Sequence, residues 1–421
     1  MTTPFKRFAA GLLFFATLTL PAACARNAPP ATQPAQPAPQ PAPPSVTATP
    51  PQQTAPAPVA QTPAPATLPE RLSDAEFWKL ITDLSEPGGY FRSDNLLSNE
   101  VWLQYVIPDL LDAAKGGAGR VYMGVGPEQN FTYIAALKPQ MVFITDVRRG
   151  NLDMHLMYKA LFEMSADRAD FVGRLFSRKR PDGLTAASSV RDIFQAYGAV
   201  QGDQKLFESN YKAIIDHLQK TRRFALDAED APGILYIYDY FFKYGPDLTY
   251  WMSGGFGGGR GGFRNSPTYG DLMVATDAGG TLRSYLASEE NYNVLKTLHS
   301  KNMFVPVVGN FAGQKALRAV GAWLKRHNAT VSAFYLSNVE QYLNQDGIWM
   351  DFCKNASELP IDQTSQFIRS FRGGGGPSFG AGGSLNQGIF PMVEDLKICA
   401  GGLIGSRSSV VGRRSSVVGH R

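Results

Sequence analysis

Apolar side chains recur at helical spacing over several stretches of the chain. Within residues 74–84 they fall three and four positions apart from Phe77 to Leu84, which is the spacing of one helix face. Ser73 or Asp74 can cap the start of this helix. The same pattern predicts helices over 101–114, 151–176 and 313–327, and further helices over 188–225.

Short apolar runs between these helices have the length and composition of buried strands. They lie at residues 121–123, 141–144, 233–239, 302–308 and 330–336. Strands that alternate with helices favour a parallel sheet, because two parallel strands are usually joined by a helical crossover. The pattern therefore predicts an α/β fold with a mainly parallel sheet and helices on both of its faces.

The first 25 residues have the pattern of a secretory signal, with two basic residues before an apolar stretch at 8–20. Cys24 lies where a bacterial lipoprotein carries its lipid, although Pro21 stands where the usual motif has Leu. Two outcomes fit this pattern: lipidation of Cys24 with membrane attachment, or ordinary cleavage beside it. Either one predicts export to the cell envelope or periplasm.

Composition divides the rest of the chain into three parts. Residues 26–68 are almost entirely Pro, Ala, Gln and Thr, which cannot bury a core and favour an extended, disordered linker. A globular domain is expected over 69–395, followed by a disordered tail over 396–421 that repeats RSSVVG. Two glycine-rich segments, at 253–263 and 372–383, are interpreted as mobile surface loops.

Charge and cysteine content narrow the classes of partner. The net charge of +5 over 421 residues is small and is partly carried by arginines near the C-terminus, so no nucleic-acid partner is expected. Cys353 and Cys399 could pair in an oxidising compartment or remain two separate buried thiols. Four histidines, at 155, 217, 299 and 327, fall on predicted helices at wide spacing. We expect them to be surface or interface side chains, and no metal site is predicted.

The segment 121–146, VYMGVGPEQNFTYIAALKPQMVFITD, carries the clearest chemical signal. A strand, a turn with Gly124 and Gly126, a short helix and a strand ending at Asp146 form the layout of a nucleotide-binding βαβ half. The glycines let backbone N–H groups approach a ligand, and the carboxylate can accept ribose hydroxyls. Gln129 replaces the third glycine of a dinucleotide fingerprint. The turn therefore favours S-adenosylmethionine, which has no pyrophosphate, over NAD or FAD. A tight turn in an ordinary α/β protein is the alternative.

Four segments, GGYFRSDNLLSNE, YMGVGPEQNF, FITDVRRGNL and FYLSNVEQYL, together resemble a family of uncharacterised bacterial proteins with a methyltransferase-like Rossmann fold. The resemblance spans roughly Asp74 to Asp346 and implies a class I S-adenosylmethionine-dependent methyltransferase-like fold. It places Gly124, Gly126 and Asp146 in the cofactor-binding positions, and it brings no established substrate. The chain has Glu128 where the common methyltransferase motif often has a third glycine.

The candidate site residues come from these motifs and from strand ends, because ligands of open α/β sheets bind outside the carboxyl ends of the strands. For the cofactor they are Gly124, Gly126, Glu128, Asn130, Asp146 and Asn310. For the substrate they are Asn99, Glu100, Asn338 and Tyr342, of which the first two could instead belong to a helix start. Glu340 could act as a base for a hydroxyl or amine acceptor, or else serve as a helix cap or a solvated charge. The segment after 302–308, taken as the fourth strand, lacks the [DN]PP[YF] motif of enzymes that methylate nucleobases.

Two functions fit these observations. The first is a methyltransferase-like enzyme that uses S-adenosylmethionine and has an unknown acceptor. The second is an exported small-molecule-binding protein, with or without a lipid anchor, that retains the nucleotide-binding fold without catalysis. The export signal conflicts with the first function, because S-adenosylmethionine is made and kept in the cytosol. Three explanations fit: the signal is misread, the exported domain binds another ligand, or the domain meets an unusual supply of cofactor.

Overall fold

The computed structural model describes residues 67–253, 266–372 and 385–400, and every structural statement below concerns these residues. The predicted signal, Cys24 and most of the linker, the repeated tail and nearly all of both glycine-rich segments lie outside them. The helices are α1 Asp74–Leu84, α2 Ile107–Ala113, α3 Gln129–Leu137, α4 Arg149–Met164, α5 Arg168–Leu175, α6 Val190–Gly198, α7 Gln204–Asp216, α8 Asp230–Tyr244, α9 Tyr269–Val274, α10 Glu289–Ser300, α11 Ala316–Arg326, α12 Val339–Gln345, α13 Trp349–Ser357 and α14 Met392–Ala400. Short helical turns are η1 His217–Thr221, η2 Gly245–Asp247 and η3 Tyr250–Ser253.

Six strands form one sheet, and they run in the spatial order β3-β2-β1-β4-β5-β6. They are β1 Gly117–Gly124, β2 Pro139–Asp146, β3 Phe304–Val308, β4 Thr330–Ser337, β5 Gln366–Arg372 and β6 Leu385–Pro391. The first five pair in parallel, and β6 runs antiparallel to β5 at the sheet edge. The predicted α/β class and mainly parallel sheet are confirmed.

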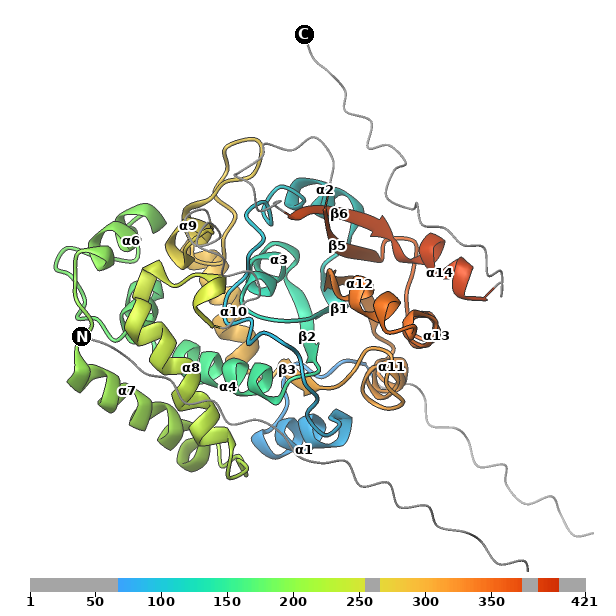
Figure 1. Ribbon diagram of the computed structural model, residues 1–421, viewed down its shortest axis with the longest axis horizontal. Helices are drawn as coiled ribbons and strands as arrows, with labels where there is room; N and C mark the ends of the chain where they lie inside the picture. Colours follow the sequence, from blue (N-terminus) through green and yellow to red (C-terminus); the bar gives the residue numbers. More distant parts are fainter. Residues whose placement is uncertain (1–66, 254–265, 373–384, 401–421) are drawn as a thin grey trace, which may run out of the picture. The chain divides into compact units, whose positions relative to one another are not determined.

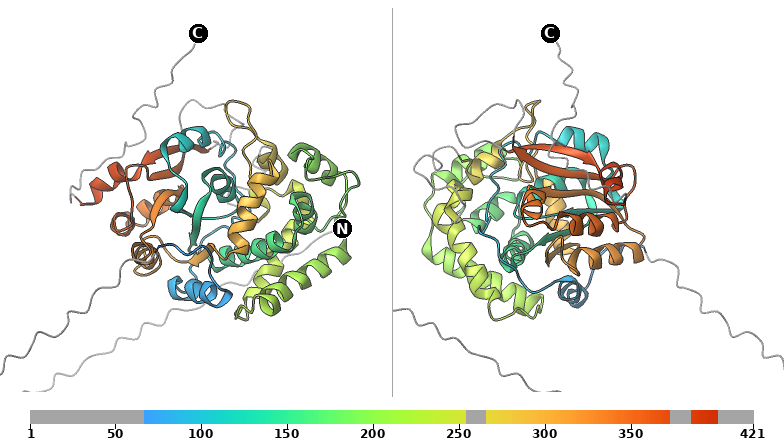
Figure 2. Two further views of the ribbon diagram at one scale, coloured as in Figure 1. Left: turned by 180° about the vertical axis from the view of Figure 1, so that it is seen from behind. Right: turned by 45° about the vertical axis from the view of Figure 1, so that its right-hand side comes forward.

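Helices cover both faces of this sheet. Helices α3, α4 and α10 pack together on one face, and α11, α13 and α14 lie on the other (Figure 1). Further helices, α7 and α8 among them, pack outside α4. The hairpin of β5 and β6 forms one side of the domain when the molecule is turned (Figure 2). A parallel sheet needs such cover because its strands are apolar on both faces. Residues 121–124 at the end of β1 are accordingly all buried.

The predicted strand at 233–239 is wrong, because these residues lie inside helix α8. The buried side chains of this helix are spaced three and four apart, at Ile234, Ile237, Tyr238 and Phe241, whereas Leu235 and Tyr236 are exposed. A run of aromatic and branched side chains has strand-like composition, but the helix buries only the face that packs on α4. Because this run was counted as the third strand, the numbers of the later strands were one too high. The run at 302–308, taken as the fourth strand, contains β3, and the run at 330–336 lies within β4.

Other element boundaries differ from the prediction for local reasons. The expected helix over 151–176 is two helices, because Asp167 caps the start of α5 by accepting a hydrogen bond from the Asp170 backbone. Of the helix expected over 101–114, only Ile107–Ala113 is helical. Strands β5 and β6 were not predicted, and they flank the second glycine-rich segment. Helix α14 extends to Ala400, past the boundary expected at residue 395.

A buried charge network fastens α1 and η1 to α4. The Glu163 carboxylate accepts hydrogen bonds from Lys159 Nζ at 2.8 Å and from Arg222 Nε at 2.9 Å, and His217 Nε2 lies 2.5 Å from it. Arg222 also donates to Asp74 Oδ1 at 3.0 Å. Burial acts to raise the pKa of Glu163, but the hydrogen bond from His217 and the charge of Lys159 outweigh it, so the pKa lies below its ordinary value. The carboxylate therefore stabilises the fold in its ionised form.

Replacing this carboxylate tests its contribution. We expect Glu163→Gln to lower the free energy of unfolding by about 3 kcal/mol near neutral pH, because the buried Lys159 ammonium loses its ionised partner, while Arg222 keeps only Asp74. Because the folded-state pKa is depressed, the difference from wild type should be full above the unfolded-state pKa and should shrink as pH falls through the folded-state value. Urea unfolding between pH 3 and 7 measures it. Asp83→Asn, which breaks an exposed ion pair with Lys79, should change stability by less than about 0.5 kcal/mol.

Candidate functional site

A cavity of about 310 Å³ lies at the carboxyl ends of the central strands. Its walls come from residues 125–127 after β1, 145–148 at the end of β2, 309–311 after β3 and 337–339 after β4. Residues between 90 and 100 form a further wall, together with Tyr250 and part of α12. This is where open α/β sheets bind ligands, since the chain leaves neighbouring strands in different directions there.

The turn after β1 is held together by Asn130. Its Nδ2 donates to the carbonyls of Val125 at 2.9 Å and Pro127 at 2.8 Å, and its Oδ1 accepts from the Tyr122 hydroxyl at 2.9 Å. A Cβ on Gly124 would lie 2.0 Å from Asn130 Oδ1, so only glycine fits at the end of this strand. Asn130 and Gly124 were predicted to touch the cofactor, but the structure buries them beneath the cavity, where they shape the turn.

Gly126 lies at the surface of the cavity and has a φ of +79°, a conformation that favours glycine. His155 Nε2 lies 3.0 Å from the Gly126 carbonyl on the side of α4. Burial lowers the pKa of His155 to about 4, so the ring is neutral and can donate this hydrogen bond. The expectation that this histidine is a surface or interface residue is therefore wrong, as it is for His299, which is also buried.

Asp146 lines the cavity and forms a two-pronged ion pair with Arg148. Its Oδ1 accepts from Arg148 Nε at 2.9 Å and from the Arg148 backbone N–H at 3.0 Å, and its Oδ2 accepts from Nη2 at 2.7 Å. A carboxylate has about four acceptor positions, so one on Oδ2 remains for a ligand hydroxyl. Arg148 also donates to the carbonyls of Ser93 and Asp94 and so attaches the 90–100 wall to the end of β2.

Asn310, Asn338 and Tyr342 line the cavity, as predicted for ligand-contacting residues. Asn310 Oδ1 accepts from the Ala312 backbone at 2.9 Å. The Tyr342 ring packs edge-on against Phe91 at 5.1 Å between centroids, and its hydroxyl accepts from Arg92 at 3.2 Å. Helix α12 and the 90–100 wall therefore contact each other beside the cavity.

Two predicted acids occupy different environments. Glu100 lines the cavity with 1% of its surface exposed, beside Asn99, and accepts from Ser337 Oγ at 2.7 Å. Glu128, expected to bind cofactor, is fully buried and does not line the cavity. Burial raises the pKa of Glu128 to about 8, although the Ser98 backbone N–H lies 3.4 Å from its Oε1. Its carboxyl belongs to the packing beneath the 90–100 wall.

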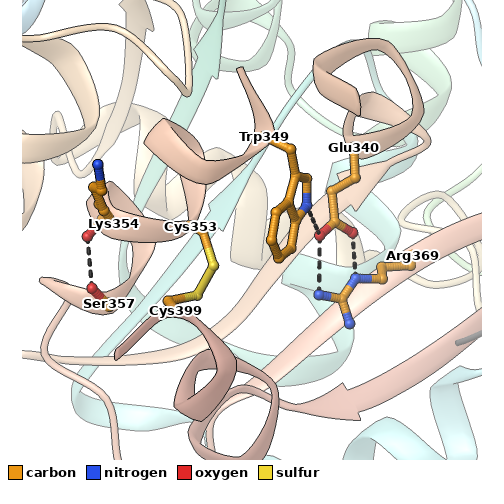
Figure 3. The surroundings of a disulfide bond; sticks show 7 residues. All are labelled: Glu340, Trp349, Cys353, Lys354, Ser357, Arg369 and Cys399. Atoms are coloured by element: carbon orange, nitrogen blue, oxygen red, sulfur yellow. Dashed lines mark hydrogen bonds and ion pairs between the residues drawn. A yellow bond between two sulfur atoms is a disulfide. The ribbon is translucent and has the colours of Figure 1, made fainter. Parts of the chain in front are cut away.

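Glu340, the candidate base, is engaged outside the cavity. Figure 3 shows its carboxylate between Arg369 and Trp349, close to the disulfide of Cys353 and Cys399. Arg369 Nε donates to Oε2 at 2.5 Å, and Trp349 Nε1 donates to Oε1 at 3.2 Å. Glu340 does not line the cavity, so its assignment as a base is corrected to that of a structural ion-pair partner.

Several residues of the cavity were not assigned as site residues from sequence. Gln129 and Thr145 line the cavity, and the buried atoms Gln129 Oε1 and Thr145 Oγ1 have no hydrogen-bond partner among the described residues. Gln129 Nε2 donates to the Tyr335 hydroxyl at 2.9 Å, which leaves its carbonyl for another group. Arg148 also lines the cavity, and its position two residues after Asp146 could have identified it from the sequence as a site residue. Ser337 lines the cavity at the end of β4 and has a φ of +49°.

The chain belongs to a protein family described as "Domain of unknown function (DUF7790)", whose model matches residues 96–229 and 267–387, more than half of the sequence. The matched ranges contain all the cavity walls except residues 90–95 and Tyr250. No curated protein matches the chain significantly. Within the described ranges, no helix is long and apolar enough to cross a membrane, and no three acidic, histidine or cysteine side chains are grouped as metal ligands.

The close approach at Gly124 can be tested by adding one methyl group. We expect Gly124→Ala to lower the free energy of unfolding by about 1–3 kcal/mol, since the new Cβ overlaps Asn130 Oδ1 and forces the turn to shift. Gly150→Ala is the control, because its Cβ would meet nothing within 4 Å near the start of α4. It should be neutral or raise stability by up to about 1 kcal/mol. Equal denaturation midpoints for the two variants would contradict the role of the turn.

Proposed function

We propose that this member of the DUF7790 family binds S-adenosylmethionine in the cavity and is a methyltransferase-like enzyme of unknown acceptor. The observation that carries the proposal is the arrangement of the β1 turn and Asp146. Gly126, just after β1, and Asp146, at the end of the neighbouring strand β2, both line the cavity, and Asp146 keeps one acceptor position. A nucleoside could place its ribose between them.

The strand order supports a nucleotide-type ligand. The order β3-β2-β1-β4-β5-β6 is that of the dinucleotide-binding folds, in which the crevice lies where the connections reverse direction, here between β1 and β4. The side chain of Gln129 fills the place of the third glycine and lines the cavity. A pyrophosphate needs close backbone approach at this turn, whereas S-adenosylmethionine has none to accommodate. The class I methyltransferase-like fold is part of this proposal.

The segment after β4 bears on the acceptor. It reads Ser337, Asn338, Val339 and Glu340, and so it also lacks the paired prolines of enzymes that methylate nucleobases. We therefore propose that the acceptor is not a nucleobase. Methyl transfer is an in-line displacement, so positioning by the cavity walls supplies most of the catalysis.

A second function, non-catalytic ligand binding by an exported protein, is favoured by one observation. Cys353 in α13 and Cys399 in α14 form a disulfide with their Cα atoms 5.5 Å apart. Structural disulfides persist in oxidising compartments, which supports export to the envelope or periplasm and attachment through Cys24. An exported domain would use the same cavity for a nucleoside-like ligand without turning it over.

Calorimetric titration of the full chain with S-adenosylmethionine and S-adenosylhomocysteine tests the proposed binding. We expect Asp146→Asn to weaken binding by about ten- to a hundredfold, because a hydrogen bond to a charged group contributes about 1.5–3 kcal/mol. Asp277→Asn is the control: Asp277 is buried and pairs with the partly exposed Arg283 at 2.9 Å, and neither residue lines the cavity. Its affinity should equal that of wild type. Absence of binding at millimolar ligand would remove the cofactor from the proposal.

Metabolic labelling with a fatty acid, combined with cell fractionation, tests the proposed export and anchor. We expect label in the membrane fraction for the wild-type chain and none for Cys24→Ser, because a thioether-linked lipid requires that thiol. Cys353→Ser serves as the control, since it removes a thiol without touching the anchor. Unlabelled protein in the periplasmic fraction would indicate cleavage without lipidation. Recovery in the cytosol would contradict export.

A further inference from the structure

Glu100 is a carboxyl group enclosed at the edge of the cavity. It is 1% exposed and lies beside the carboxyl end of β4, where Ser337 Oγ donates to its Oε1 at 2.7 Å. Gln387 Nε2, from β6, donates to its Oε2 at 3.2 Å. These two hydrogen bonds hold the carboxyl oxygens in a fixed orientation, and Glu100 is one of the residues that line the cavity.

No basic side chain forms an ion pair with Glu100 in the part of the chain that the structure describes. The groups that interact with it from the surrounding elements are neutral or acidic: Glu128 directly before α3, Tyr133 on α3, Tyr122 on β1, Tyr335 and Ser337 on β4, Ser370 on β5 and Gln387 on β6. Two cations among the described residues line the cavity: Arg148 has its guanidinium on Asp146, and Arg92 donates to the Tyr342 hydroxyl. An ionised Glu100 would therefore be a buried charge without a counterion.

The ionisation of the buried Glu100 carboxyl depends strongly on a nearby cation. Burial raises the pKa of Glu100, while its hydrogen bonds from Ser337 and Gln387 oppose the shift. A buried carboxylate is costly unless it is paired. A positive charge that enters the cavity supplies the missing partner and lowers the cost of ionisation. Ligand charge and the protonation of Glu100 should then be linked.

We propose that Glu100 makes the cavity selective for a ligand with a fixed positive charge, so that it binds the sulfonium of S-adenosylmethionine in preference to the neutral thioether of S-adenosylhomocysteine. This inference rests on the proposed function. The two ligands carry the same ammonium and carboxylate, so the sulfonium is their only difference in charge. As the cation binds, the Glu100 carboxyl loses its proton to the solvent and becomes the carboxylate counterion.

Titration calorimetry of the full chain between pH 5 and 8, in phosphate and in Tris, measures both affinity and proton release. We expect S-adenosylmethionine to bind at least about tenfold more tightly than S-adenosylhomocysteine near pH 8, since two charges in a partly buried site interact strongly. Its affinity should rise with pH and its binding should release a proton. The affinity of S-adenosylhomocysteine should not vary in this way.

Glu100→Gln should reduce the preference to within about threefold and abolish proton release, because the amide cannot ionise. Glu128→Gln is the control, since Glu128 is buried nearby but does not line the cavity. This variant should keep both the preference for S-adenosylmethionine and the proton release. Thermal unfolding of each variant confirms that it is folded. Equal wild-type affinities for the two ligands, or a preference that survives in Glu100→Gln, would overturn the inference while leaving cofactor binding intact. If neither ligand binds wild type, both the inference and the proposed function are wrong.

Discussion

The amide side chain of Asn130 fixes the turn on which the cavity depends. It satisfies the carbonyls of Val125 and Pro127 and accepts from Tyr122, so the backbone after β1 is held in one conformation. The close approach leaves no room for a Cβ at Gly124. His155 fixes the next part of the turn through the Gly126 carbonyl. Buried backbone groups need such partners, and here side chains of two helices provide them without occupying the cavity.

The charges around the cavity are distributed unevenly. Arg148 is paired with Asp146 and also attaches the 90–100 wall to β2, so its charge serves the architecture as well as the site. Glu100 has hydrogen bonds from neutral groups only, close to the end of β4. The two walls therefore differ: one carries a compensated ion pair and the other a carboxyl whose ionisation depends on what binds. Under the proposal made above, this difference links the ligand's charge to proton release by the protein.

The sequence predicted the first βαβ unit well, because its apolar runs are short, fully buried and separated by a glycine turn and a proline. The positions of Asp146, Asn310, Asn338 and Tyr342 at or after strand ends predicted that they share a site, since the carboxyl ends of parallel strands meet at one edge of the sheet. All four line the cavity. Composition misled at 233–239, where the buried face of a helix–helix contact contains the same residue types as a strand. The β5–β6 hairpin was not predicted, because its two strands lack a regular alternation of apolar and polar residues. Only the tertiary structure shows that β5 pairs with β4 and β6.

The sequence alone determined which strand ends would carry polar groups, because periodicity and turn chemistry are local properties of the chain. Only the tertiary structure decided which of those groups face a ligand. Glu340 and Glu100 are both acids near strand β4, yet Arg369 from β5 takes the first, while the second is enclosed by neutral donors from β4 and β6. Partners of this kind come from segments far apart in the chain, so burial and pairing of a carboxyl cannot be read from its neighbours in sequence.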